Sequence, residues 1–354
     1  MLLQPQGGAL AQSITEVLDA LPDRLRPQVS SETHSAAVEL TTGIHARVGD
    51  GVAELARLRH DIHAVLAGLG MTAAVAGTHP FAVWDEMVVA PGARHQAVQG
   101  SVRALARREP TFALHVHVGV SDPGTAMRLF NRLRAHLPIL LALSANSPFW
   151  QGRDTGLASA RTPLFQAFPR VGIPRPFAGF RAWAHAIDLL IRTDTMPDPT
   201  YIWWDVRPQP RFGTVEVRIM DAQSRLDHDG PLAALVQSLA RLEATEGFAS
   251  PVAVEAQEAL EENRFLATRD GVTARFVDPD TETRVPACEL LTELLGACAP
   301  HAAELGCAGD LAAVPAIAED GADARQRRVA AEREGLVGLV AALSEEFLSA
   351  PSDS

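Results

Sequence analysis

The chain has 354 residues, enough for one large domain or two, and 47% of them are hydrophobic, which is ample for a sizeable core. Its net charge of −12 argues against nucleic acid as a partner, because contacts to phosphate backbones need a basic surface. All 31 basic residues are arginine, which excludes a P-loop lysine, a Schiff base and a pyridoxal-phosphate attachment. Any bound phosphate must therefore be held by arginine, by metal or by backbone N–H groups.

The three cysteines, Cys288, Cys298 and Cys307, are odd in number and lack C-x-x-C spacing. This pattern favours neither a disulfide framework nor a zinc knuckle, and it indicates a reducing, cytoplasmic setting. No basic segment followed by an apolar run opens the chain, so no signal peptide is predicted. The longest apolar stretch, residues 137–143, is far too short to span a bilayer, and we expect no membrane partner.

Apolar periodicity predicts strands and helices in mixed order. The first three residues are typical of the end of a strand and lack a polar lead-in. A strand is predicted over 36–43, with Glu39 and Thr41 on one face and Val38 and Leu40 on the other. A short apolar strand is expected over 71–76. The expected helices cover 50–69, 96–108, 126–144, 177–192, 231–246, 252–268, 287–296 and 324–348.

A further alternating strand is predicted over 112–120, where His115 and His117 share one face. Histidines at i and i+2 on a strand can contact the same metal ion. The same pattern also arises by chance, and a lone histidine is more often structural than a ligand. Both readings stay open from this segment alone.

The long apolar helix over 126–144 contains Pro138, which predicts a kink. It leads into residues 144–156, a loop dense in hydrogen-bonding side chains and in glycines that permit tight turns. Such a loop can bind a polar ligand, or it can be a plain connection. Residues 309–322 are rich in Ala, Asp and Gly and predict a loose, mobile link.

Residues 201–206 are strand-like, and 207–211 are expected to be a hairpin connection. The next segment, 212–221, alternates strictly, so that Thr214, Glu216 and Arg218 share one face. The carboxylate and the guanidinium lie about 7 Å apart at roughly 3.4 Å of rise per residue. The pair could hold a divalent cation and an anionic phosphate, or it could simply be solvated on the wet face of an antiparallel sheet.

Three predicted strands thus project Glu39, His115 with His117, and Glu216 with Arg218 from polar faces. If the strands are neighbours, these faces converge on one basin. Hard oxygen ligands favour Mg²⁺ or Mn²⁺ over zinc. A basin of this kind, with arginine and without lysine, suits phosphoryl transfer from ATP, where catalysis is mainly positioning and charge neutralisation.

Six sequence segments, in this order, resemble the carboxylate–amine ligases of the glutamate–cysteine ligase type 2 family. They are Val-Glu-Leu-Thr-Thr-Gly (38–43), Ala-Gly-Thr-His-Pro-Phe (76–81), His-Val-His-Val-Gly-Val (115–120), Ala-Leu-Ser-Ala-Asn-Ser-Pro-Phe-Trp-Gln-Gly-Arg-Asp-Thr-Gly (142–156), Ile-Trp-Trp-Asp-Val-Arg-Pro (202–208) and Val-Glu-Val-Arg (215–218). The likeness covers about residues 1–290, and the 144–156 stretch is its most specific part.

The resemblance implies an α+β, glutamine synthetase-like ligase fold, with a curved antiparallel sheet cupping the active site and helices outside. It implies ATP- and Mg²⁺-dependent joining of the L-glutamate γ-carboxylate to L-cysteine through a γ-glutamyl phosphate. The site residues that it implies fall into three groups. They are Arg218 and His115 as catalytic residues, Asn146, Ser147 and Arg161 near the substrates, and Glu39, Glu216 and His117 as metal ligands.

Members of this family open with a strand that reads Gly-Val-Glu-Glu-Glu, and this acidic triplet would fall just before Met1. We expect the start codon to be assigned too late; the alternative is a weakened or non-catalytic binding protein on the same scaffold. A metal hydrolase built on His115 and His117 is a third, weaker hypothesis. The predicted catalytic domain covers 1–300, and 301–354 are expected to add the loose link and a last helix. That helix could pack on its own chain or in a homodimer.

Overall fold

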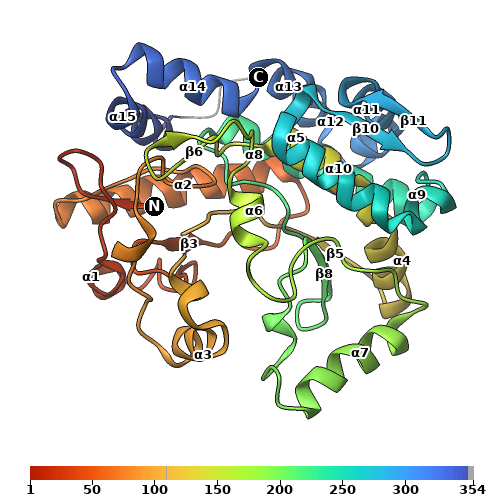
Figure 1. Ribbon diagram of the computed structural model, residues 1–354, viewed down its shortest axis with the longest axis horizontal. Helices are drawn as coiled ribbons and strands as arrows, with labels where there is room; N and C mark the ends of the chain where they lie inside the picture. Colours follow the sequence, from red (N-terminus) through yellow and green to blue (C-terminus); the bar gives the residue numbers. More distant parts are fainter. Residues whose placement is uncertain (109, 350–354) are drawn as a thin grey trace.

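The protein has an α+β fold in which many helices surround several small antiparallel sheets (Figure 1). The computed structural model describes residues 1–108 and 110–349. Within these residues the sheets are β1–β4, β2–β3, β5–β9–β8, β6–β7 and β10–β11. The strands are β1 (Leu2–Leu3), β2 (Val29–Ser31), β3 (Val38–Leu40), β4 (Thr72–Ala73), β5 (Val116–Gly119), β6 (Phe149–Trp150), β7 (Arg153–Asp154), β8 (Val206–Gln209), β9 (Thr214–Val217), β10 (Arg275–Asp278) and β11 (Thr283–Pro286).

The helices lie where apolar residues recur at helical spacing, with several boundaries moved. The first eight are α1 (Ile14–Ala20), α2 (Val48–Gly68), α3 (Ala93–Val102), α4 (Pro123–Leu133), α5 (Leu137–Ser144), α6 (Arg161–Phe165), α7 (Phe180–Arg192) and α8 (Leu226–Thr245). The others are α9 (Pro251–Glu255), α10 (Gln257–Asp270), α11 (Ala287–Leu305), α12 (Ala308–Ala312), α13 (Val314–Asp320), α14 (Ala322–Glu332) and α15 (Leu336–Phe347). No helix in the part of the chain that the structure describes is long and apolar enough to cross a membrane.

The three-stranded sheet β5–β9–β8 has β9 as its middle strand, which covers only residues 214–217 of the strand expected over 212–221. β9 pairs antiparallel with β5 on one side and with β8 on the other. Val215 and Val217 are completely buried, and α4 and α8 pack against the sheet. The predicted apolar face is therefore confirmed, because side chains that alternate along a strand place every second residue in the core.

The N-terminal strands form separate sheets. β1 pairs with β4, and the Met1 amino group donates to the Ala74 carbonyl at 2.9 Å. β3, which carries Glu39, pairs with β2 and not with the central sheet. The curved sheet expected from the resemblance is thus divided into short pieces, because most of these strands are only two to four residues long.

Several sequence predictions about element boundaries need correction. The helix expected over 252–268 is divided into α9 and α10, and the helix expected over 324–348 is divided into α14 and α15. The helix expected over 126–144 is broken into α4, a 3₁₀ turn (Arg134–His136) and α5, with Pro138 in the first turn of α5. Proline is tolerated in the first turn, where its missing N–H would have no helical partner. The strand expected over 201–206 begins only at Val206, so residues 207–209 are strand and not a hairpin connection.

The segment 309–322, predicted to be a loose link, forms the helices α12 and α13. Leu311, Val314 and Ile317 lie three residues apart and are buried in the main core, which explains why the segment is ordered despite its small polar residues. The last helix, α15, packs on its own chain: Ser344 donates to the Ala73 carbonyl at 2.8 Å. Figure 1 shows α14 and α15, in blue, at the edge of the fold beside α13.

Candidate active site

Glu216, in the middle of β9, is the centre of the candidate site. The strand register places His117 of β5 opposite it on one side and Arg207 of β8 on the other. Arg207 donates from Nε at 2.7 Å, and Arg218 donates from Nη1 to the other carboxylate oxygen. His115 and His117 approach the same oxygen to 3.7 and 3.6 Å. The structure therefore brings three other predicted site residues, His115, His117 and Arg218, together around the Glu216 carboxylate.

The Glu216 carboxylate is held in its charged form. Only 3% of its side chain is exposed, and burial alone would raise its pKa, but Arg218 and Arg207 hold that pKa well below its usual range. The solvated alternative for the Glu216–Arg218 pair is therefore wrong, since both side chains are largely buried.

The surroundings of both histidines favour the neutral imidazole. Burial and the nearby Arg218 guanidinium lower the pKa of His115 well below its ordinary value, and burial lowers that of His117. Arg218 Nη1 lies 3.4 Å from His115 Nδ1. A guanidinium can only donate, so Nδ1 is the acceptor and the His115 proton is on Nε2. His117 contacts the Thr214 hydroxyl at 3.0 Å through its own Nδ1.

Glu39 reaches the same region from the separate sheet β2–β3. Ser30 donates to its carboxylate at 3.1 Å. Burial and the neighbouring Glu32 carboxylate raise the pKa of Glu39 to about 7, with Arg218 and Glu216 close enough to act on it electrostatically. The structure thus places Glu39 within the field of the central cluster, although β3 does not join the central sheet.

The raised pKa of Glu39 predicts a pH-dependent stability. The folded state binds the proton more tightly than the unfolded state, so this residue lowers the free energy of unfolding as pH rises from about 4.5 to about 7. In magnesium-free buffer, the free energy of unfolding of wild type should fall over this range by on the order of 2 kcal/mol more than that of Glu39→Gln. This figure is reduced for screening by solvent. Urea unfolding at several pH values measures it. Parallel curves for the two proteins would contradict the prediction.

The predicted metal ligands do not form a complete metal site by themselves. Among residues 1–108 and 110–349, no group of three or more His, Cys, Asp or Glu side chains is arranged to hold a metal ion. Both oxygens of Glu216 already accept from guanidinium groups. Glu39 and Glu32 repel each other electrostatically, and a bound cation would relieve that repulsion. The metal roles of Glu39, Glu216 and His117 stay a prediction.

The three residues predicted near the substrates gather around a different carboxylate, that of Asp221. It is completely buried and accepts from the Asn146 backbone N–H at 2.9 Å and from the Ser147 hydroxyl at 2.6 Å. Ser159 donates at 3.0 Å, and Arg161 lies 3.5 Å away. The side chain of Asn146 is also engaged within the protein. Their contact with substrates stays a prediction.

Arg207 and Asp221 are the two important residues that sequence reasoning missed. Arg207 lies in β8, where residues 206–209 alternate in the way that marks a strand, but its segment had been interpreted as a connection. Asp221 follows two buried apolar residues, Ile219 and Met220. A lone carboxylate in such surroundings needs donors, and the polar loop 144–156 could have suggested them.

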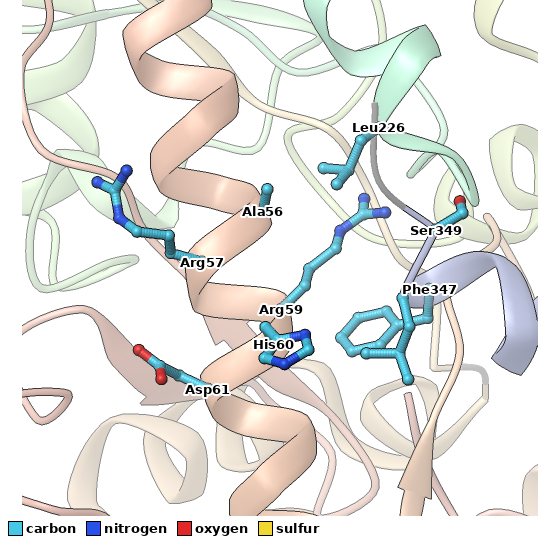
Figure 2. A pocket seen from close by; sticks show the side chains of 9 residues that line it. Ala56, Arg57, Arg59, His60, Asp61, Leu226, Phe347 and Ser349 are labelled. Atoms are coloured by element: carbon cyan, nitrogen blue, oxygen red, sulfur yellow. The ribbon is translucent and has the colours of Figure 1, made fainter. Parts of the chain in front are cut away.

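A pocket of about 360 Å³ lies elsewhere, between α2, the start of α8 and the end of α15. Figure 2 shows the Arg59 guanidinium on the side of Leu226 and Ser349, with His60 beside Phe347. Arg59 is fully engaged, because it donates to Asp229 at 2.8 Å and to the Ser224 carbonyl at 3.0 Å. None of the predicted site residues lines this pocket.

The fold is that of the glutamate–cysteine ligases. A crystal structure of glutamate–cysteine ligase from Francisella tularensis in complex with AMP superposes with a TM-score of 0.72, covering 99% of this chain and 87% of that one at 12% identity. A bifunctional glutathione synthetase from Pasteurella multocida gives 0.69 at 14% identity, covering 92% of this chain and 48% of that one. These likenesses confirm the expected ligase fold.

The model of the family "Glutamate-cysteine ligase family 2" matches residues 3–343. A protein of Rubrobacter xylanophilus named "Putative glutamate–cysteine ligase 2-1" is 38% identical over 339 residues, which are 96% of this chain and 90% of that protein. A protein of Sorangium cellulosum named "Putative glutamate–cysteine ligase 2" is 37% identical over 95% of this chain and 91% of its own length. The chain therefore belongs to glutamate–cysteine ligase family 2, and its class is that of the carboxylate–amine ligases.

Proposed function

We propose that this protein joins L-glutamate to L-cysteine at the expense of ATP. The γ-carboxylate of glutamate attacks the γ-phosphorus of ATP, which gives γ-glutamyl phosphate and ADP. The cysteine amine then attacks the acyl carbon, phosphate leaves, and γ-glutamylcysteine forms. Family membership and the ligase fold support the reaction class, and glutamate and cysteine are the substrates in the names of the relatives.

The observation that carries the proposal is an unpaired donor on Arg218. Its Nε atom is buried and has no hydrogen-bond partner among the described residues, while Nη1 is fixed on Glu216. Buried donors are rarely left unpaired. Other buried atoms of the described residues, Arg161 Nε among them, also lack a partner, and Arg218 is distinguished from them by its place beside Glu216 and His115. In the proposed reaction Arg218 donates to an oxygen of the phosphoryl group and stabilises the charge that spreads over it during transfer.

His115 supplies a second, neutral donor in this proposal. Its proton is on Nε2, because Nδ1 accepts from Arg218. A neutral imidazole can donate to a phosphate oxygen without adding another positive charge beside two guanidinium groups. We propose that His115 orients the nucleotide phosphates and that Arg218 acts on the transferred group.

ATP would enter with Mg²⁺ (or Mn²⁺) on its own phosphates, and the ion would neutralise phosphate charge when bound. Glu39, whose pKa burial and the Glu32 carboxylate raise, is the residue that we propose meets the ion from the protein side. The described residues do not form a full ligand set, so no step of the proposal is routed through the metal.

The proposal is tested by ADP release from ATP. We expect release to require both glutamate and cysteine, with γ-glutamylcysteine identified by mass spectrometry. Release that needs glutamate and a different amine would keep the reaction and change the acceptor. Nucleotide binding in calorimetry without turnover by any amino acid in a panel would overturn the proposal and favour a non-catalytic binding protein.

A further inference from the structure

The backbone of Arg218 is hydrogen-bonded on both sides to residues that belong to buried ion pairs. Its N–H donates to the carbonyl of Asp205 at 2.8 Å, and its carbonyl accepts from Arg161 Nη2 at 3.1 Å. Asp205 and Arg161 each belong to an ion pair, Asp205 with Arg264 and Arg161 with Asp221. Arg218 lies one residue beyond the end of β9, and its bond to Asp205 keeps the register of the β8–β9 pairing, in which Val206 lies opposite Val217.

The ion pair on the carbonyl side of Arg218, Arg161 with Asp221, makes more contacts than the other. Asp221 accepts from Asn146, Ser147 and Ser159 as well as lying 3.5 Å from Arg161. Arg161 also donates to the Ile219 carbonyl at 2.9 Å. The Asp221 carboxylate, itself held by three donors, therefore orients the planar guanidinium of Arg161. That guanidinium donates to the carbonyls of two consecutive residues, Arg218 and Ile219.

The packing around Asp221 leaves no room for a side chain at Gly77. A Cβ atom added at Gly77 would lie 2.7 Å from the Asp221 carboxyl group and 2.9 Å from Ser147 Cβ. The loop 144–156 and the turn at Gly77 thus close on this carboxylate from two sides. A rigid surrounding of this kind is what a catalytic group needs from its supporting residues.

We propose that Asp221 is a positioning residue for Arg218, acting through Arg161. The inference rests on the proposed phosphoryl transfer, and it gives the signature loop 144–156 a role in fixing the guanidinium of Arg218. Geometry at the reacting group is worth much in rate, since a displacement of about 1 Å can cost on the order of 10²-fold. Asp221→Asn keeps the size of the side chain and removes the charge that fixes Arg161.

The test is a double-mutant cycle on the rate of ADP formation. We expect Asp221→Asn to lower kcat about 10²-fold with little change in the KM for ATP. In an Arg218→Lys background, the same substitution should cost less than about threefold, because the group that it positions is already displaced. Glu243→Gln is the matched control: Glu243 is another buried carboxylate with three donors, but they are Arg132, His136 and the Ala249 N–H, remote from Arg218.

The outcomes separate the inference from the proposed function. A wild-type protein without ADP release sinks the proposed function, whatever Asp221 does. An active wild type in which Asp221→Asn behaves like Glu243→Gln, or costs the same factor with and without Arg218, overturns the positioning role. If Asp221→Asn does not fold, Ser159→Ala removes one donor to Asp221 and should show the same dependence on Arg218 at smaller size.

Discussion

Replacement of Arg218 by alanine is expected to lower kcat for ADP formation about 10³-fold, the range seen when a guanidinium that stabilises a transferring phosphoryl group is lost. The protein should stay folded, because Glu216 keeps its hydrogen bond from Arg207 Nε at 2.7 Å and no buried charge is left alone. The KM for ATP should change much less than kcat if the contact forms mainly in the transition state. Steady-state ADP release measures both constants.

The matched control is Arg211→Ala. Arg211 lies on the turn that joins β8 to β9, and its guanidinium sits 5.6 Å from the ring centre of Phe212. It removes the same charge from the same hairpin without touching Glu216. We expect less than a threefold change in kcat. An Arg218→Ala protein that is folded and retains more than a tenth of the wild-type kcat would contradict the role given to Arg218.

Strand periodicity predicted most of the central cluster and missed Arg207. Alternation over 212–221 places Glu216 and Arg218 on one face, and this arrangement is confirmed. It could not supply Arg207, because a cross-strand neighbour depends on which strands pair and in which register. The pairing of Arg207 with Glu216 also explains why this polar face is buried, whereas the sequence alone left a solvated face open.

The likeness of the loop 144–156 to the ligase family predicted the fold, but a sequence motif does not say which residues contact each other. Asn146, Ser147 and Arg161 were expected near the substrates, and in the structure they surround Asp221. Composition was misleading at 309–322, where small and acidic residues hid three apolar residues at helical spacing. Such marginal helices form because tertiary packing overrides weak local propensity.

Substitution of Glu216 by glutamine is expected to cause the largest loss of stability, about 3 kcal/mol in the free energy of unfolding at pH 7. The side chains of Arg207 and Arg218 are only 11% and 12% exposed, and without the carboxylate both charges would be buried and unpaired. Glutamine keeps the size of the side chain, so the loss reports charge and not a cavity. Urea unfolding measures it. The control is Glu304→Gln, which removes an exposed partner of Arg241 and should cost less than about 1 kcal/mol.

The difference in the free energy of unfolding between wild type and Glu216→Gln should also depend on pH. The folded state holds the pKa of Glu216 below its ordinary value of 4.5, so the folded protein binds this proton less tightly than the unfolded chain. The stabilisation is therefore fully present above about pH 4.5 and is lost progressively as pH falls below it. The gap between wild type and Glu216→Gln in the free energy of unfolding should narrow progressively as pH falls below about 4.5. A gap that widens in acid, or a variant as stable as wild type at pH 7, would mean that the two arginines do not depend on this carboxylate.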